Sequence, residues 1–509
     1  MDYLVRLVQV HESFRRPELE ALSTLADLPH EVISYSENSP FCILRFPTLS
    51  SSHDPAIDAR IRDFESRSIL SKCIYELWGQ GRDYEELHED TKRRSQHRWE
   101  TFRHHSFKFS VDSYGSTRDV DQQREIINSF RYLDFKGKIQ MKGAEAEFAV
   151  LEEWLPVASE SKEAAREASI SGCTVDKIAG TSLRRVFLAR KVGDSRRWLR
   201  EKHDLKKRPY ISTTSMDAEL ALLTANMALA SPGKIFLDPF VGTGGFMVAA
   251  AELGAVVLGS DIDGRSFRGK GTGLDTGVGA NLQKYGLTHL SGDCCTSDLT
   301  NTPFRTMEIA DGSSDGRWLD GIICDPPYGV REGLKVLGTK FRPSRSPAPE
   351  LNGQSSTLLK SNSPLTPALI DGVPAHTLPG YIAPKKPYSF ARMLDDILGF
   401  AARTLVDGGR LAFWMPSANE NELGVEEATV IPMHQHLLLK HECVQKFNRW
   451  SRRLLVYERL PGAPQAQREA VEAAVQGLAE VNINARTADE LNPFRRRYFQ
   501  SFAADSNES

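Results

Sequence analysis

The stretch Lys234–Ala251, KIFLDPFVGTGGFMVAAA, decides the fold class of this chain. Its first four residues are mostly apolar and predict a buried strand, and the apolar run that begins at Phe246 predicts a buried helix. Between them, Asp238 opens a turn that contains three glycines. Glycine lets the backbone turn tightly and approach a ligand closely where a helix begins. A strand that runs through such a turn into a helix is typical of α/β folds built on a parallel sheet.

Two familiar nucleotide-binding versions of this turn do not fit the sequence. The dinucleotide pattern G-x-G-x-x-G requires glycine at position 247, which is Met247. A phosphate-binding loop ends in Lys followed by Ser or Thr, whereas Gly264–Gly271 reads GRSFRGKG and has glycine in the hydroxyl position. The sequence therefore disfavours both a nicotinamide dinucleotide and a nucleoside triphosphate.

The strand–turn–helix order of this stretch is repeated along the C-terminal half of the chain. Such an alternation predicts a doubly wound, mostly parallel sheet whose ligands bind at the carboxyl ends of its strands. The last two expected strands are close enough in sequence to pair antiparallel. The expected strands are Lys234–Leu237, Ala255–Gly259, a short strand near Leu290 that ends at Asp293, Gly321–Cys324, Arg410–Met415, Leu437–Val444 and Arg453–Arg459. The expected helices are Ser215–Ala230, Phe246–Leu253, Val278–Tyr285 and Phe390–Leu405.

Aspartates are expected at the ends of four consecutive strands: Asp238, Asp261, Asp293 and Asp325. A single one is usually a helix cap or a turn residue, but four in succession indicate a shared site. Asp261 lies 23 residues after Asp238, close to the spacing of the ribose-binding carboxylate in Rossmann-like folds. Acids beside a glycine turn without a lysine fit S-adenosylmethionine, which has no phosphates. The expected cofactor contacts are Asp238, Phe240, Gly242, Gly244, Asp261, Ile262 for the adenine face and Asp293 for the adenine amino group.

The tetrapeptide Asp325-Pro326-Pro327-Tyr328 follows the expected strand Gly321–Cys324 and is the candidate catalytic motif. Each proline locks its own φ and pushes the residue before it into an extended conformation. Because proline has no N–H, the carboxylate and the nearby carbonyls form a rigid group of acceptors. Such a group can hold the exocyclic amine of a flat base while the ring of Tyr328 covers the base. Taken alone, the tetrapeptide fits an ordinary Asp-Pro turn equally well.

The composition is that of a soluble protein with several domains. The chain has 509 residues, of which 26% are charged and 40% are hydrophobic. No run approaches the ~18 apolar residues of a membrane span, and the start of the chain lacks the features of a signal peptide. Seven scattered cysteines without a C-x-x-C pair predict reduced thiols, a cytoplasmic location and no metal site.

The net charge of −3 conceals two basic segments that indicate an RNA partner. Between Arg184 and Arg208 there are eleven Lys or Arg residues against three acids. Between Lys92 and Lys108 there are six against one, interleaved with aromatic residues. Such patches supply salt-sensitive phosphate binding, although a solvated helix face has the same pattern. The expected RNA contacts are Arg196, Arg197, Arg200, Lys206, Lys207 and Arg208.

The motifs together carry a resemblance to a known family. The DPPY tetrapeptide beside this cofactor turn resembles the class I amino-methyltransferases, whose [DN]-PP-[YF] motif serves N-methylation of bases. RPYISTTSMDAELALLTANMAL (208–229) and GSDIDGRSFRGKGTG…NLQKYGL (259–287) further resemble the catalytic subunits of eukaryotic tRNA (guanine-10-N2)-methyltransferases. The resemblance is strong over roughly 208–330 and weaker over 1–190.

The resemblance implies a fold, a reaction and a partner. It implies a THUMP-type N-terminal α/β module that binds tRNA and a Rossmann-like class I methyltransferase domain. The implied reaction is methylation of guanine N2 in tRNA with S-adenosylmethionine as the methyl donor. A small zinc-binding activator subunit, shared among several methyltransferases, is implied as well.

These observations predict four regions along the chain. They are an N-terminal α/β region with the THUMP-type module (1–190), a basic linker (191–209), a methyltransferase domain (210–460) and a tail (461–509). A Pro- and Ser-rich stretch at 340–387 is expected to be a disordered insertion in the third region. One helix, Gln465–Val481, is expected in the tail.

Two other functions stay open at the level of the sequence. The first is methylation of another base amine, such as a guanine in rRNA, another guanine in tRNA, or an adenine or cytosine. The second is a catalytically silent RNA-binding scaffold. The intact glycine turn, Asp261 and the DPPY tetrapeptide argue against the silent scaffold, because a silent site has no need of all three.

Overall fold

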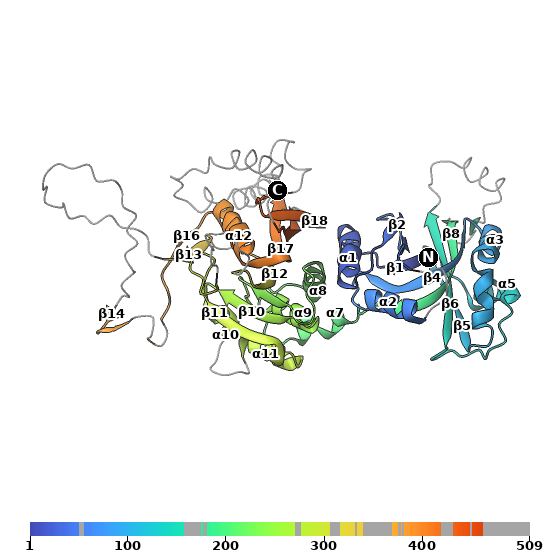
Figure 1. Cartoon of the computed structure of the whole chain (residues 1–509), viewed down its shortest axis with the longest axis horizontal. Helices are drawn as coiled ribbons and strands as arrows, with labels where there is room; N and C mark the ends of the chain where they lie inside the picture. The colour runs from blue at the N-terminus through green and yellow to red at the C-terminus, as the bar shows by residue number, and fades with distance from the viewer. Residues whose placement is uncertain are drawn as a thin grey trace, which may run out of the picture.

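The computed structural model of the chain describes residues 1–49, 55–156, 175–176, 181–269, 276–305, 316–330, 333–338, 369–374, 378, 381–418, 431–447 and 450–461. Most of the 340–387 insertion and all but the first residue of the 461–509 tail lie outside these residues, and so does the helix expected at Gln465–Val481. The described residues form two α/β regions, which helix α7 (Leu199–Lys202) connects (Figure 1).

The N-terminal region is built on one mixed sheet with the strand order β2-β3-β1-β4-β8-β6-β5, to which β7 adds a short pairing with β8. Among its described strands, β5 and β6 pair in parallel and the other neighbours pair antiparallel. The strands are β1 (Asp2–Leu7), β2 (Glu31–Ser34), β3 (Phe41–Arg45), β4 (Ser71–Gly81), β5 (Phe107–Tyr114), β6 (Ala146–Pro156), β7 (Val175–Asp176) and β8 (Thr181–Asp194). The helices are α1 (Glu12–Leu25), α2 (Pro55–Glu65), α3 (Tyr84–Ser95), α4 (Trp99–Phe102) and α5 (Val120–Ser129).

Three apolar clusters line this sheet, and two of them pack its strands against helices. One joins strand β1 to helices α1 and α2 around Val5, Leu22 and Phe64, all buried. The other joins strands β4 and β6 to helix α3 around Trp78 and Phe148. Burial of alternating strand residues against amphipathic helices is what stabilises such a layer arrangement.

The C-terminal region is built on a sheet with the strand order β11-β10-β9-β12-β17-β19-β18. The first five strands are parallel, and β19 and β18 are antiparallel to their neighbours, as the sequence predicts. The strands are β9 (Ile235–Asp238), β10 (Val256–Asp261), β11 (Ser291–Thr296), β12 (Leu319–Cys324), β17 (Leu405–Ala418), β18 (Leu437–Lys446) and β19 (Trp450–Arg459). Two small pairs, β13 (Lys335–Leu337) with β16 (Lys385–Pro387) and β14 (Leu369–Ile370) with β15 (Val373–Pro374), lie outside it. The helices are α8 (Ala218–Met227), α9 (Gly245–Glu252), α10 (Gly264–Arg268), α11 (Gly277–Lys284) and α12 (Phe390–Thr404).

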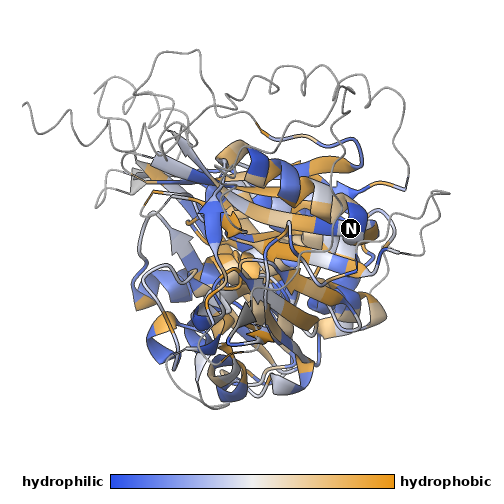
Figure 2. Ribbon diagram, turned by 90° about the vertical axis from the view of Figure 1, so that its left-hand side faces the viewer, coloured by the Kyte–Doolittle hydropathy of each residue, from blue (hydrophilic) through white to orange (hydrophobic). Residues whose placement is uncertain are grey.

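Helices cover both faces of this second sheet. Helices α8, α9 and α11 share one apolar cluster with the strands, and α12 belongs to the cluster on the opposite face. Figure 2 shows hydrophobic residues concentrated along the central strands, which are buried between the helix layers. The predicted doubly wound fold is therefore confirmed.

The two regions meet where helix α1 lies against the second sheet. The ring of Phe14 stacks on that of Trp414, with 5.8 Å between the ring centroids. The Ser13 hydroxyl both donates to the carbonyl of Val444, at 3.1 Å, and accepts from its N–H, at 3.0 Å. The N-terminal region thus contacts strands β17 and β18 directly.

Candidate active site

The strand order brings three of the four predicted aspartates together. Strand β9 lies between β10 and β12, so Asp238 is flanked by Asp261 and by Asp325, the residue that follows β12. Each neighbouring carboxylate raises the pKa of Asp238, in addition to the larger effect of burial. The order of strands reverses between β9 and β12, and ligands bind at such a reversal in open α/β sheets.

The glycine turn after β9 is fastened to the neighbouring strand. The N–H of Val241 donates to Ser260 at 2.9 Å, and the N–H of Gly242 donates to the Asp261 carboxylate at 3.1 Å. Gly244 has φ 76°, and a Cβ atom there would lie 2.6 Å from a methyl carbon of Val278. The turn therefore requires glycine for its backbone conformation and for the space beside helix α11.

Asp238 and Asp261 support this turn in different ways. Asp238 is 4% exposed, and its carboxylate accepts from the N–H of Phe240 at 3.0 Å. Asp261 is half-buried and also accepts from the N–H of Asp263 at 2.9 Å. Each carboxylate oxygen has two acceptor positions, so Asp261 retains capacity for a ligand. Ile262, which follows it, is partly buried at the same strand end.

The strand-end position predicted for Asp293 is wrong. Strand β11 runs from Ser291 to Thr296, so Asp293 lies inside it, exposed and with φ 75°. The acid at the carboxyl end of β11 is Asp298, which accepts from the N–H of Thr300 at 2.8 Å. The error arose because the adjacent cysteines interrupt the apolar pattern, which made the strand look shorter than it is.

The DPPY tetrapeptide forms a compact polar group at the end of β12. The Tyr328 hydroxyl donates to the Asp325 carboxylate at 2.5 Å, and the Asp325 side chain is 24% exposed. Burial raises the pKa of Asp325 to about 6, against the lowering effects of the Tyr328 hydrogen bond and of Arg452. Pro326 is buried and Pro327 is exposed. A carboxylate with this pKa is ionised at neutral pH and still able to accept a proton.

Several residues beside Asp325 come from the β18–β19 hairpin and were missed in the sequence. Arg452 lies 3.9 Å from the Asp325 carboxylate, and the ring of Trp450 meets that of Tyr328 edge to face at 6.0 Å. Phe447 stacks on Trp450 at 4.6 Å. To predict that these residues lie beside Asp325 would have required the pairing register of this hairpin, and a single sequence does not determine that register.

A buried asparagine joins the two stretches that carry the family resemblance. Asn281, from α11, accepts from the N–H of Tyr210 at 3.1 Å and donates to its carbonyl at 2.8 Å. The same side chain donates to the carbonyl of Thr243 in the glycine turn at 3.0 Å. Next to Tyr210 lies a hollow of about 950 Å³ lined by Pro209, Tyr210, Ile211, Asp263, Arg265, Ser266, Gly269, Thr276, Gly277 and Ala280.

Comparison with known proteins assigns the chain to a family. Residues 1–177 match the family described as "Tmrp11 THUMP N-terminal domain", and residues 206–289 match "RMKL-like, methyltransferase domain". The chain is 41% identical to the tRNA (guanine(10)-N(2))-methyltransferase of Saccharomyces cerevisiae over 89% of this chain and 92% of that protein. The chain belongs to the tRNA (guanine(10)-N(2))-methyltransferase family.

Two further relatives agree with this membership. The chain is 33% identical to the Schizosaccharomyces pombe member over 98% of this chain and 96% of that protein. It is 30% identical to the human member TRMT11 over 90% of this chain and 88% of that protein. Among solved structures, TrmN from Thermus thermophilus matches with 16% identity and a TM-score of 0.37, covering 90% of this chain and all of that one.

In this family member the basic linker is only partly available to an RNA. The prediction for Arg208 is wrong, because its side chain is buried beside Tyr285 and Gly245, and burial lowers its pKa. Arg197 is largely buried and pairs with Glu219 at 2.7 Å. The exposed cations of the linker are Arg196, Arg200, Lys206 and Lys207, next to the 57% exposed ring of Trp198.

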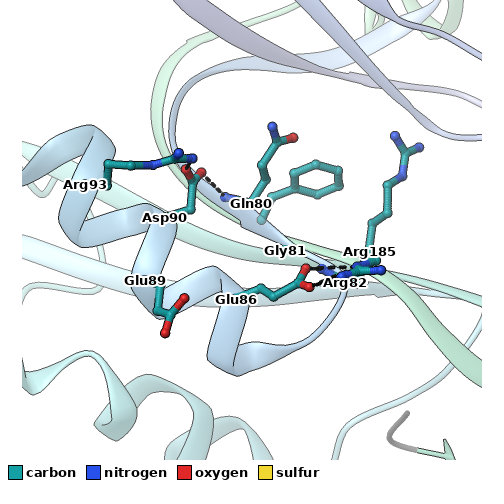
Figure 3. A pocket seen from close by; sticks show the side chains of 9 residues that line it. Gln80, Gly81, Arg82, Glu86, Glu89, Asp90, Arg93 and Arg185 are labelled. Carbon is teal, nitrogen blue, oxygen red and sulfur yellow. Dashed lines mark hydrogen bonds and ion pairs between the residues drawn. The ribbon is translucent and has the colours of Figure 1, made fainter. Parts of the chain in front are cut away.

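A second hollow, of about 530 Å³, lies in the N-terminal region between helix α3 and strands β4 and β8 (Figure 3). Its three arginines are already paired: Arg82 with Glu86, Arg93 with Asp90 at 2.5 Å, and Arg185 with Glu153 at 2.7 Å. Because these charges neutralise each other, the hollow offers no concentrated positive field for a phosphate.

Neither a metal centre nor a membrane span is found in the described part of the chain. No group of three or more His, Cys, Asp or Glu side chains there is arranged to hold a metal ion. No described helix is both long enough and apolar enough to cross a bilayer.

Proposed function

We propose that this chain transfers a methyl group from S-adenosylmethionine to the exocyclic N2 amine of guanine 10 in tRNA. Membership in a family whose curated members are named for that activity supports the proposal. The single observation that carries it in this chain is the acceptor group of Asp325 and Tyr328, which lies one strand away from the glycine turn.

The residues at the glycine turn fit an S-adenosylmethionine site. The turn lies beside acidic residues, and a carboxylate accepts hydrogen bonds from the hydroxyls of a ribose. We assign ribose binding to Asp261, adenine packing to Ile262 and Phe240, and support of the turn to Asp238. The backbone of Gly242 and Gly244 would approach the ligand closely. The contact with the adenine amino group stays assigned to Asp293, whose exposed carboxylate accepts from the N–H of Cys294 at 2.7 Å.

The proposed role of Asp325 is to hold and orient the amine. Bound S-adenosylmethionine supplies a methyl group activated by its sulfonium. The lone pair of a guanine N2 amine is delocalised into the ring, so an acceptor that favours a pyramidal nitrogen increases its reactivity. Asp325 and the Pro326 carbonyl accept the amine N–H groups, and Pro327 restricts that carbonyl. Such positioning contributes at best about 7–11 kcal/mol, and the carboxylate then stabilises the developing positive charge.

The reaction has two further requirements: a group that accepts the proton of the amine, and a contact for the face of the guanine base. The Asp325 carboxylate, with its pKa of about 6, or a water molecule accepts the proton that the amine loses after methyl transfer. The target guanine must leave its stack to reach a strand-end pocket, as with base-flipping enzymes. We assign to Tyr328 the contact with the face of the extruded base, next to Trp450.

We assign tRNA binding to the N-terminal region and to the exposed linker cations. RNA helices are recognised largely through shape and backbone, which suits a module distant from the methylated base. The proposed division is 1–190, 191–209, 210–460 and 461–509, although β8 extends the first sheet to Asp194. A small zinc-binding activator subunit remains part of the proposal. A cytoplasmic location agrees with the six described cysteines, all of them free thiols.

The experiment that tests this function is position-specific. Purified chain, with and without the activator, is given labelled S-adenosylmethionine and a tRNA transcript that carries guanine or inosine at position 10. We expect N2-methylguanosine with the guanine transcript and no product with inosine, which lacks the N2 amine. Equal methylation of both transcripts would place the target elsewhere and favour the alternative, another RNA base amine.

A further inference from the structure

The guanidinium of Arg452 faces the same space as the carboxylate that holds the amine. Arg452 comes from β19, and its Nη1 atom is 3.9 Å from Oδ2 of Asp325. This distance is too long for a hydrogen bond, so the two charges attract each other without a direct contact. The guanidinium also hydrogen-bonds the Tyr328 hydroxyl. Because a guanidinium carries five N–H donors, Arg452 keeps donors for a ligand after its bonds to Tyr328 and Gln445. The Arg452 side chain is 15% exposed and therefore largely desolvated.

Arg452 is held in this orientation from three directions. Its Nε–H donates to the Gln445 side chain at 2.6 Å. Its guanidinium lies over the Trp414 ring at 4.6 Å and over the Phe447 ring at 5.7 Å. The Trp414 ring is itself fixed by a hydrogen bond to Thr224 at 3.2 Å. The orientation is thus set before any ligand binds, which lowers the entropy cost of recognition.

A fixed guanidinium beside an amine-holding carboxylate matches one base in particular. Guanine carries the N2 amine and the N1–H as donors, and the O6 carbonyl as an acceptor further along the same edge. Arginine is the residue that most often recognises the O6 and N7 acceptors of guanine. Adenine and cytosine instead present their exocyclic amine next to an unprotonated ring nitrogen.

We propose that Arg452 selects guanine, by donating a hydrogen bond to O6 of the base whose N2 amine Asp325 holds. This inference rests on the function proposed above and adds the determinant of its base specificity. Arg452 is thus a residue that contacts the substrate and not only a neighbour that orients Asp325.

The test compares two bases that share the amine and differ at O6. A tRNA ligated with 6-thioguanine at the target position keeps the N2 amine, N1–H and N7, but sulfur is a weak acceptor. We expect wild type to prefer guanine in kcat/KM, and Arg452→Met or Arg452→Ala, which have no N–H donor in the side chain, to reduce that preference by about 5- to 150-fold, the range of a good base contact. Rates are measured at several pH values between about 7 and 8, where the N1–H of both bases is retained, so that a change in the ionisation of Asp325 is separated from a change in base preference.

A matched control lies next to it on the same strand. Arg453 points to the opposite face and pairs with Glu442 at 2.7 Å, so Arg453→Lys should leave the preference unchanged. S-adenosylmethionine binding, measured by calorimetry, shows which variants are folded. If the Arg452 variants slow both substrates equally, Arg452 only positions Asp325 and the inference is overturned, while the proposed function stands. If wild type forms no N2-methylguanosine on the guanine tRNA, it is the proposed function that fails.

Discussion

At the scale of single residues, the site depends on how Asp325 is kept ionised in a partly buried position. Burial raises its pKa, and the Tyr328 hydroxyl and the charge of Arg452 both lower it. The balance leaves the pKa at about 6, between that of a free carboxyl group and neutral pH. The DPPY motif made Asp325 and Tyr328 predictable from sequence. Arg452 was not predictable, because it lies more than a hundred residues later and approaches only through the sheet order.

The first prediction concerns the pH dependence of kcat. Because the carboxylate form is the active one, kcat should fall as pH drops through about 6. Tyr328→Phe removes a hydrogen bond that stabilises the carboxylate, so the pKa of Asp325 rises and the acid limb should move to higher pH. Stopped-time methylation assays from pH 5 to about 9 measure this shift. An acid limb that stays in place in Tyr328→Phe would contradict this role for the hydroxyl.

At the scale of elements, the turn between β9 and α9 was the most predictable part of the molecule. The apolar residues on either side of its glycines predict both the strand before the turn and the helix after it. Strand β11 was less predictable, because its sequence SGDCCT lacks a clear apolar alternation. Strand β4 and helix α1 are difficult to predict from sequence, since mixed polar and apolar positions conceal their buried faces. In the linker, only the folded structure separates the buried Arg208 from the exposed Lys206 and Lys207.

The second prediction concerns this turn. Gly244→Ala combines an unfavourable φ of 76° with a contact of 2.6 Å to Val278. We expect at least a tenfold weaker affinity for S-adenosylmethionine, measured by calorimetry. Gly233→Ala is the control, because Gly233 has φ 81° but no atom within 4 Å of the added carbon. Equal affinity in the two variants would show that the close approach to Val278 is unimportant.

At the scale of the whole molecule, helix α1 ties the N-terminal region to the catalytic sheet. Phe14 is fully buried and belongs to the same apolar cluster as Trp414, whose ring lies under Arg452. The family resemblance predicted two modules, but no pattern in the sequence indicated that they share a core. The contact depends on side chains about 400 residues apart, which local periodicity does not reveal.

The third prediction tests this shared core by calorimetry. Phe14→Ala should cost about 3–5 kcal/mol, as for other buried phenylalanines, and should lower the unfolding temperature of the methyltransferase region. Phe64→Ala, in the cluster of α1 and α2, should destabilise mainly the N-terminal region. The coupling is refuted if Phe14→Ala leaves the methyltransferase transition where it was.

The fourth prediction concerns RNA affinity. Replacing Arg196, Arg200, Lys206 and Lys207 by Gln should weaken tRNA binding at low salt and make it less dependent on salt. Each lost phosphate contact reduces the slope of log K against log salt by about 0.7–0.9. Arg197→Gln breaks a structural ion pair with Glu219 and should change stability more than this slope. A slope unaffected by the fourfold replacement would remove the linker from the RNA-binding surface.

The most direct test of the central claim is methyl transfer by Asp325→Ala, measured together with S-adenosylmethionine binding. We predict that turnover on tRNA falls by at least a hundredfold, because the acceptor for the guanine amine is lost, while S-adenosylmethionine binds with nearly unchanged affinity. Asp320→Ala, in the same strand but near its amino end, serves as the control and should retain turnover. Normal turnover in Asp325→Ala would contradict the assignment of Asp325 as the group that holds the amine.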